Sequence, residues 1–380
     1  MAAAVVLNDA SQMQADAEEP EGFLGVVLRS VGADDPVELA PGGPTLVTTL
    51  ADARTVLTSP ADYELPFDVS RQRIRGDQEI RKATAPLTAD AVGVGRRTFA
   101  EELGSAAIQF RGPDLDTQVF LRLPVARSTT AALVPEADHD SRNQVADLVL
   151  AWIDSLAPVI GAARPPRRFS KPRRAEQRAR RLLIRRLEAL GCADAGARAT
   201  MLAAGIQVPI AAGAWCLTML AGRPDLVHGL RERDDLVLSV VWETIRLFPP
   251  SWLLPRITTR EVRLGRTTLP AYTALVVSPL VLGRLPGLVP GPEDGGPPLD
   301  EYQPTRWLDT ERRPGAWLPF GAGQHACPGR NLGMAQLAHL VAWVSEFDLS
   351  SPGPPRIDTS RGLSPDPPRI DVLPRVRGTA

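Results

Sequence analysis

Cysteine is scarce in this chain of 380 residues, which contains only Cys192, Cys216 and Cys327. Three thiols cannot form the disulfide framework of a small secreted domain, so the sequence fits a reducing cytoplasm. Histidine is also scarce, with four residues, and no C-x-x-C pair occurs. A zinc site therefore has little support, because His325 and Cys327 supply only two neighbouring ligands.

An excess of charge and a long apolar N-terminal run are lacking too. The formal net charge is -1 at pH 7, which argues against nucleic acid or an anionic membrane as the main partner. The apolar stretch over residues 1–7 is too short to span a bilayer or to act as a signal peptide. We therefore expect a cytoplasmic protein that binds neither nucleic acid nor membrane.

Apolar residues are plentiful, at 44% of the chain, although only 5% of the residues are aromatic. Their spacing is mostly helical, with short alternating runs between turns rich in glycine and proline. We predict a mainly α-helical protein with small β-sheets. Residues 1–22 are predicted to be a flexible tail, and residues 23–380 a single domain. Predicted strands cover residues 37–39, 45–47, 261–264 and 274–277, and predicted helices include residues 52–57, 143–156, 198–221 and 236–248.

The most distinctive stretch is residues 320–329, FGAGQHACPG, which contains Cys327. Its three glycines indicate a tight loop whose backbone can approach a flat ligand closely. Downstream, Leu337, Leu340 and Val344 have helical spacing, so a helix is expected to begin just after the loop. We expect the dipole of that helix to favour the thiolate form of Cys327.

This loop resembles the haem-binding loop of cytochromes P450. Residues 320–333 match the family pattern F-G-x-G-x-H-x-C-x-G-x-x-L-[AG] at every fixed position. The resemblance implies that Cys327 is the thiolate ligand of the iron of haem b, which favours O–O cleavage. It also implies that Phe320, Gly321 and Gly329 shape the cofactor site. The alternative, that Cys327 is a small buried apolar residue, leaves the glycines and the nearby histidine unexplained.

The same resemblance implies the cytochrome P450 fold, in which a single haem lies between a long central helix and the cysteine loop. Membrane-anchored members of the family carry a long apolar N-terminal helix. No such helix is apparent in this sequence, which points to the soluble bacterial type.

Glu243 and Arg246 lie three positions apart on the helix predicted over residues 236–248, so they share one face. The E-x-x-R of the P450 family has this spacing at this distance before the cysteine loop. There the pair is buried and helps to hold the core beside the haem, whereas a surface pair would contribute little.

By the same resemblance, Arg256 and His325 bind the haem propionates, and the fork of guanidinium donors suits a carboxylate. The family also has an H-x-x-x-R pattern earlier in the chain, within the region that corresponds to the arginine-rich residues 71–97. This chain lacks that histidine, and Arg81 is our candidate for the arginine. The alternative for this stretch is a solvated basic face.

A second basic run covers residues 164–186, with eleven Lys or Arg residues and one acid, Glu176. Nucleic-acid binding is one interpretation of such a run. Leu183, Leu187 and other leucines supply an apolar face, so we prefer an amphipathic helix whose arginines face solvent.

The most apolar segment, residues 198–221, is predicted to be a long buried helix that crosses the haem. P450s carry A-G-x-[DE]-T here, and the acid and alcohol order water and deliver protons. In this chain Gly205 is followed by Gln207 and Val208 at the positions of the acid and the alcohol, and then by Pro209. Because proline lacks an N–H, we expect a kink that leaves the Gly205 carbonyl free for water or substrate.

The preferred functional hypothesis is a monomeric haem-thiolate monooxygenase that oxidises a small-molecule intermediate of secondary metabolism. It would use O₂ and electrons from a ferredoxin and its reductase, with a substrate pocket lined near Ala203, Gln207, Val208, Trp252 and Leu253. A second hypothesis is an atypical P450 that works with peroxide, or that catalyses a rearrangement or cyclisation without net oxygen insertion. A third is a non-catalytic relative that binds a partner enzyme. The intact cysteine loop argues against the third, since a scaffold needs no thiolate.

Overall fold

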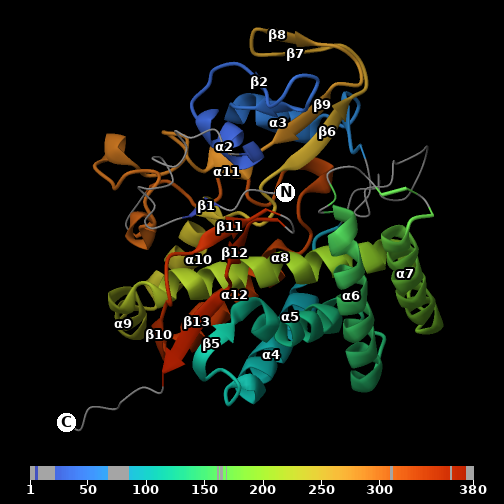
Figure 1. The fold of residues 1–380 in the computed structure, drawn as a ribbon, viewed down its shortest axis with the longest axis vertical. Helices are drawn as coiled ribbons and strands as arrows, with labels where there is room; N and C mark the ends of the chain where they lie inside the picture. The colour runs from blue at the N-terminus through green and yellow to red at the C-terminus, as the bar shows by residue number, and fades with distance from the viewer. Residues whose placement is uncertain are drawn as a thin grey trace.

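Helix α8 (Ala195–Ala221) crosses the middle of the protein, between a helical region and a region of small sheets (Figure 1). The computed structural model describes residues 5–6, 22–66, 85–160, 162, 166–167, 169–308, 311–359 and 362–373. The other helices are α2 (Gly22–Arg29), α3 (Leu50–Thr58), α4 (Ala89–Ala106), α5 (Thr117–Leu133), α6 (His139–Ile160), α7 (Lys171–Ala189), α9 (Pro224–Glu232), α10 (Asp235–Leu247), α11 (Pro279–Leu282) and α12 (Arg330–Val344). Short 3₁₀ turns are η3 (Pro292–Asp294), η4 (Pro304–Trp307) and η5 (Gly323–His325).

The strands form small sheets. The largest has the order β2-β3-β9-β6-β4, in which β3 and β9 are parallel and the other pairs antiparallel. Its strands are β2 (Val37–Glu38), β3 (Thr45–Val47), β9 (Ala274–Val277), β6 (Leu254–Thr258) and β4 (Tyr63–Glu64). The smaller sheets are β1-β11-β12, β10-β13-β5 and β7-β8, made by β1 (Val5–Val6), β5 (Gly112–Asp116), β7 (Val262–Leu264), β8 (Thr267–Leu269), β10 (Asp348–Ser350), β11 (Arg356–Asp358), β12 (Ser364–Asp366) and β13 (Arg369–Leu373).

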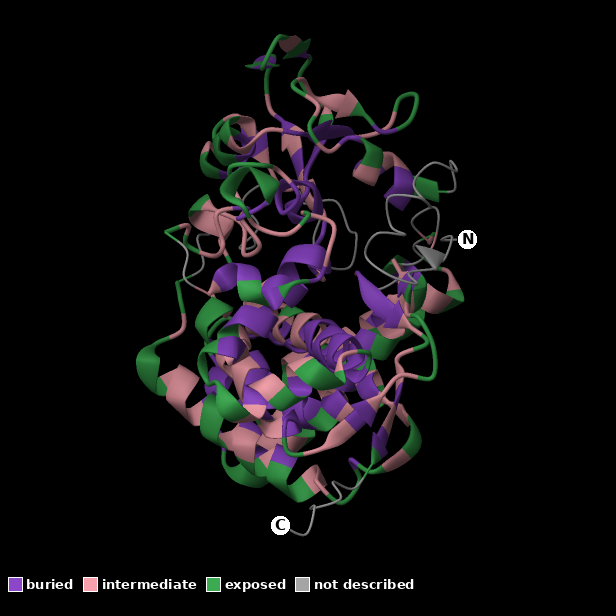
Figure 2. Cartoon of the chain, turned by 90° about the vertical axis from the view of Figure 1, so that its left-hand side faces the viewer, coloured by how far each residue is buried: buried purple, intermediate pink, exposed green. Residues whose placement is uncertain are grey.

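Burial is concentrated around α8, which contacts α5, α6, α7, α10 and α12 (Figure 2). By length and composition α8 could cross a membrane, but 61% of its most apolar window is buried inside the protein. Such burial is typical of the core helix of a globular protein. A helix that is apolar on all sides must be covered on all sides, and the surrounding helices provide that cover.

Side-chain caps fix the starts of the helices that surround the core. Thr88 accepts a hydrogen bond from the N–H of Ala91 at 3.2 Å before α4, and Asp116 accepts one from Val119 at 2.9 Å before α5. Before α8, Asp194 accepts one from Ala197 at 3.2 Å. Each cap satisfies a backbone donor that the first helical turn leaves without a partner.

Most of the predicted elements are present, and the mainly helical class with small sheets is confirmed. The helix predicted over residues 143–156 is the centre of α6, and the basic run forms α7. Leu183 and Leu187 are buried on α7, as expected for an amphipathic helix. The sequence pattern did not show that Glu176 is buried on α7, where its carboxylate accepts the indole N–H of Trp152 from α6 at 3.1 Å.

The N-terminal boundary was predicted at residue 22, which is the first residue of α2. Val5 and Val6 form β1 and pair with Ile357 and Arg356 of β11. The division into a tail and one domain otherwise stays a prediction.

Candidate functional site

The cysteine loop is a tight turn that ends at the N-terminus of α12. The N–H of Cys327 donates to the carbonyl of Phe320 at 2.9 Å and closes the loop. Gly321 and Gly323 have φ angles of +67° and +70°, which favour glycine. A Cβ on Gly323 would lie 2.4 Å from the carbonyl oxygen of Leu57 at the end of α3. The loop therefore packs backbone against backbone, as its glycines predicted.

Cys327 lines a cavity of about 480 Å³ that lies between the cysteine loop and α8. It is exposed, whereas the other two cysteines are buried. Most of the described lining side chains are aliphatic, and Phe320 supplies the only aromatic ring of Phe, Tyr or Trp among them. The polar lining residues are Thr129, Thr200, Ser251, Arg256, His325, Cys327 and Gln336.

The expected effect of the α12 dipole on Cys327 is outweighed by burial. Burial among protein atoms raises the pKa of the Cys327 thiol above its usual value, although the N–H groups of Gly329 and Arg330 and the charge of Arg330 lower it. The N–H groups at the helix end therefore favour the thiolate, as expected, but burial has the larger effect. The side chain is nevertheless accessible because it faces the cavity.

Arg256 is a buried cation in the wall of this cavity. It lies on β6 with 5% of its surface exposed, and its Nη1 donates to the carbonyl of Pro255 at 2.8 Å. Burial lowers the pKa of Arg256, and no ion-pair partner for it is found among the described residues. His325 lies in the same lining, and burial and the charge of Arg256 lower its pKa. An anionic group at this wall would offset an uncompensated buried charge.

Helix α8 presents one face to the cavity, with Met201, Gly205, Val208 and Ala212 at helical spacing. Gln207 is not part of the lining. Neither is Ala203, although it was predicted to line the pocket. It is 3% exposed and lies in the core on another face of the helix. The neighbouring residue Ala204 lines the cavity instead.

Trp252 and Leu253 were also predicted to line the pocket and do not. Trp252 packs against Phe23 of α2 with ring centroids 6.0 Å apart, and its carbonyl accepts the hydroxyl of Ser278 at 2.8 Å. Leu253 packs on the same apolar cluster. Their neighbours Ser251 and Leu254 line the cavity instead.

The Gly205 carbonyl is only partly free, which modifies a second expectation about α8, because one of its two lone pairs already accepts a hydrogen bond from the protein. Thr129 of α5 donates its hydroxyl to this carbonyl at 3.2 Å. Sequence reasoning missed Thr129 and its neighbour Gln336 of α12. The signal available in the sequence was the run of three hydroxyl side chains at residues 128–130, all of which the structure buries.

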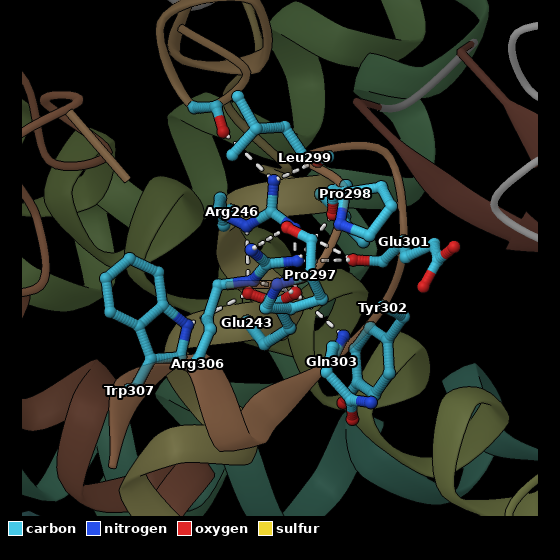
Figure 3. A network of polar contacts seen from close by, with 12 residues as sticks. Glu243, Arg246, Pro297, Pro298, Leu299, Glu301, Tyr302, Gln303, Arg306 and Trp307 are labelled. Atoms are coloured by element: carbon cyan, nitrogen blue, oxygen red, sulfur yellow. Dashed lines mark hydrogen bonds and ion pairs between the residues drawn. The ribbon is translucent and has the colours of Figure 1, made fainter. Parts of the chain in front are cut away.

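Glu243 and Arg246 form a buried ion pair on α10, with both side chains 0% exposed (Figure 3). The two N–O distances are 2.7 and 2.8 Å. Arg306 of η4 adds a contact of 2.9 Å to the same carboxylate, and Trp307 donates its indole N–H to it at 2.9 Å. Burial alone would raise the pKa of Glu243, but Arg246, Arg306 and the N–H of Gln303 together hold it below its usual value. Arg306 and Trp307 were not predicted as partners.

The two arginines also hold a long loop in place. Arg246 donates to the carbonyls of Gly283, Leu299 and Glu301, and Arg306 donates to those of Pro290, Pro297, Pro298 and Glu301. The proline-rich segment before η4 is therefore tied to the core by its backbone (Figure 3).

Comparison with known proteins identifies the family. The sequence model of cytochrome P450 matches residues 198–374, which include the pair on α10 and the whole cysteine loop. The structure of CYP175A1 from Thermus thermophilus superposes with a TM-score of 0.73, covering 96% of this chain and 97% of that one at 23% identity. A 6-coordinated cytochrome P450 from another strain of the same organism superposes with a TM-score of 0.66, covering 88% of this chain and 93% of that one at 23% identity. Residues 198–374 thus match the cytochrome P450 family, and the chain has the fold of solved P450 structures. The P450 fold expected from the cysteine loop is thereby confirmed.

Curated relatives are similar to a part of this chain. Cyclooctatin synthase of Streptomyces melanosporofaciens is 32% identical over 166 residues, which is 38% of this chain and 35% of the relative. Cyclooctat-9-en-7-ol 5-monooxygenase of the same organism is 32% identical over 168 residues, with the same coverage. The match thus spans about a third of the length of these relatives.

The match to the P450 family implies a haem-iron cofactor, and the cavity residues fit such a group. A thiol at the cavity wall can bind iron, and a buried guanidinium can bind a carboxylate. A Cβ at Gly329 or Gly333 would meet no atom of the described residues within 4 Å, so a flat group has room to lie against the loop. No cluster of three His, Cys, Asp or Glu residues that could hold another metal ion occurs in the described ranges. Arg81 lies outside the described residues.

Proposed function

We propose that this P450 is a haem-thiolate monooxygenase that oxidises an apolar small molecule. The observation that carries the proposal is that Cys327 lines a mostly aliphatic cavity, opposite α8. Haem iron with a thiolate ligand supplies the oxygen-activating chemistry. The chain's own residues bind that group, shape the substrate space and exclude water from it.

In this proposal Cys327 ligates the iron of haem b, and Arg256 and His325 hold the propionates. Phe320, Gly321 and Gly329 leave a flat surface for the ring, and Arg81 stays the candidate for a further propionate contact. The aliphatic wall favours an alicyclic or branched hydrocarbon skeleton over a charged substrate, because the cavity offers no described carboxylate and only one buried guanidinium.

The names of the relatives support a substrate from secondary metabolism. One relative is named for action on cyclooctat-9-en-7-ol, an alcohol on a hydrocarbon skeleton. We propose that this P450 works as a cytoplasmic monomer with O₂ and electrons from a ferredoxin and its reductase. Neither nucleic acid nor a membrane is proposed as a partner.

A second candidate function follows from the face of α8. Gln207 and Val208 occupy the positions of the acid and alcohol, and neither side chain titrates near neutral pH. This favours an atypical P450 that works with peroxide, or one that catalyses a rearrangement or cyclisation without net oxygen insertion. A non-catalytic partner protein has less support, because a scaffold needs no thiol at a cavity wall.

The proposal is tested by the absorption spectrum of the reduced CO complex. We expect haem in the purified protein and the red-shifted Soret band of a thiolate ligand, which Cys327→Ala should abolish. Cys216→Ala is the matched control, since Cys216 is buried in α8 and should leave the band unchanged. A band that survives Cys327→Ala would refute the ligand assignment. Product analysis with O₂ or with peroxide then separates the two candidate functions.

A further inference from the structure

Pro209 leaves one backbone acceptor of α8 without its usual helical partner. The carbonyl of Gly205 would normally accept the N–H of residue 209, which proline lacks. The Thr129 hydroxyl of α5 donates to this carbonyl at 3.2 Å instead. Gly205, Pro209 and Thr129 all belong to the cavity lining. The structure thus supplies an alcohol beside Gly205 from a different helix.

A buried amide completes this corner of the cavity. Gln336 of α12 is 1% exposed and also lines the cavity. Its Nε2 donates to the hydroxyls of Ser128 at 2.9 Å and Thr129 at 3.3 Å. Its Oε1 is buried and has no hydrogen-bond partner among the residues that the structure describes. The Ser128 hydroxyl donates in turn to the carbonyl of Gly95 at 2.7 Å, so it is not available to Oε1.

The hydrogen bonds in this corner leave only acceptor capacity unused. The single hydroxyl hydrogen of Thr129 and both amide hydrogens of Gln336 are engaged. One lone pair of Thr129, one of the Gly205 carbonyl and both of Gln336 Oε1 remain. A ketone or an ether cannot satisfy them, because neither donates. An ammonium group is disfavoured, because no described carboxylate lines the cavity to offset its charge.

We propose that Thr129, Gln336 and the Gly205 carbonyl form a binding site for one O–H donor in the wall of the apolar cavity. The donor is either a water molecule or a hydroxyl group of the substrate. Bound there, it lies beside the stretch of α8 that lacks the acid and alcohol. An unpaired buried acceptor is costly, so an occupant also stabilises this corner. The role of such a donor in catalysis rests on the proposed function.

The water source is tested by a high-resolution crystal structure of the haem-loaded protein without substrate. We expect a water molecule within hydrogen-bond distance of Gln336 Oε1 and Thr129 Oγ1. Gln336→Met replaces the amide by an apolar chain of similar size and should lose this water. Haem content and the Soret band of the CO complex report whether the variant is still folded.

The substrate source is tested with cyclooctanol and cyclooctanone as probes, titrated calorimetrically into the haem-loaded protein. The alcohol can donate a hydrogen bond and the ketone cannot. We expect cyclooctanol to bind more tightly than cyclooctanone, and Thr129→Val to reduce that preference roughly 2- to 10-fold, the value of one hydrogen bond. Thr129→Ser keeps the hydroxyl and is the matched control, expected to retain the preference.

The outcomes separate the two sources. An ordered water that Gln336→Met removes, with no preference for the alcohol, assigns the site to water. A preference for the alcohol that Thr129→Val removes and Thr129→Ser keeps assigns it to a substrate hydroxyl. If no ordered water is found and the alcohol is not preferred, the proposed site is overturned. That result would leave haem binding intact, whereas failure of the proposed function would appear as absence of haem or of the thiolate band.

Discussion

Nε of Arg306 lies 2.9 Å from the carboxylate of Glu243, although 63 residues separate them in sequence. The carboxylate also pairs with Arg246 of its own helix, and none of the three side chains is exposed. The other N–H groups of each guanidinium donate to backbone carbonyls. The cluster therefore joins α10 to the loop that leads to the cysteine turn, and it should behave as one structural unit.

Removal of one member of this cluster should be strongly destabilising. Glu243→Ala leaves two buried guanidiniums without their carboxylate, and breaking a buried pair costs about 3–5 kcal/mol. Arg306→Met leaves the pair with Arg246 but removes four carbonyl contacts, so a smaller loss is expected. Chemical denaturation measures both free energies of unfolding.

The surface pair Arg233–Asp235 provides the control for this prediction, since both side chains are more than half exposed. Arg233→Ala should give no measurable change in the unfolding midpoint. An unchanged unfolding midpoint for Arg306→Met, as expected for Arg233→Ala, would mean that the contact of Arg306 with Glu243 does not stabilise the fold.

Acid should remove part of the stability that Glu243 provides. Its pKa lies below the usual value of 4.5 in the folded protein, so its contribution is fully present above pH 4.5. As the pH falls below 4.5 the unfolded chain binds the proton first, and the contribution is lost as the pH falls through the folded pKa. The difference in unfolding free energy between the native protein and Glu243→Gln should therefore shrink with acid. A difference that is constant from pH 7 to pH 3 would contradict this.

The cluster also illustrates what sequence can predict. The spacing of Glu243 and Arg246 predicts their shared face because helix geometry is local. No local rule brings Arg306 to the same carboxylate, since that contact depends on the path of a long proline-rich loop. The cysteine loop was predicted in detail for a related reason. Its glycines and cysteine lie within ten residues, so their relation is fixed by local backbone geometry.

The rotation of α8 was harder to predict. An amphipathic helix reveals its buried face through its polar residues, but this helix is apolar on nearly all sides. The sequence therefore could not distinguish Ala203, which is in the core, from Ala204, which lines the cavity. The roles of Thr129 and Gln336 depend on the packing of three helices. They become apparent only when α5, α8 and α12 are placed together.

Two glycines of the cysteine loop should respond differently to alanine. At Gly323 the positive φ and the Leu57 carbonyl, which lies where a Cβ would point, oppose any side chain. Gly323→Ala should destabilise the protein by roughly 1–3 kcal/mol. At Gly329 the φ angle is −92° and a Cβ meets no atom within 4 Å. Gly329→Ala should keep the unfolding midpoint but weaken haem binding, because its methyl group enters the space proposed for the ring.

Thermal unfolding and haem titration measure these two properties separately. A lower unfolding midpoint of Gly329→Ala with unchanged haem binding would mean that this glycine stabilises the loop and does not make room for the cofactor. Equal midpoints for Gly323→Ala and the native protein would mean that the approach to α3 can relax without cost.

Arg256 and Arg246 are both buried arginines, and they should respond in opposite ways to methionine. Arg246 has a carboxylate partner and carbonyl acceptors, so Arg246→Met should destabilise the protein whether or not haem is bound. Arg256 has no carboxylate among the described residues, and its burial lowers its pKa, which indicates a charge held at a cost. In the haem-free protein Arg256→Met should therefore leave stability unchanged or increase it. In the haem-loaded protein the same variant loses charge-assisted hydrogen bonds to a bound carboxylate, each worth about 1.5–3 kcal/mol. Haem transfer to a haem-scavenging protein should accelerate roughly 10- to 100-fold. Unchanged transfer together with lower stability of the haem-free protein would show that Arg256 supports the fold and holds no propionate.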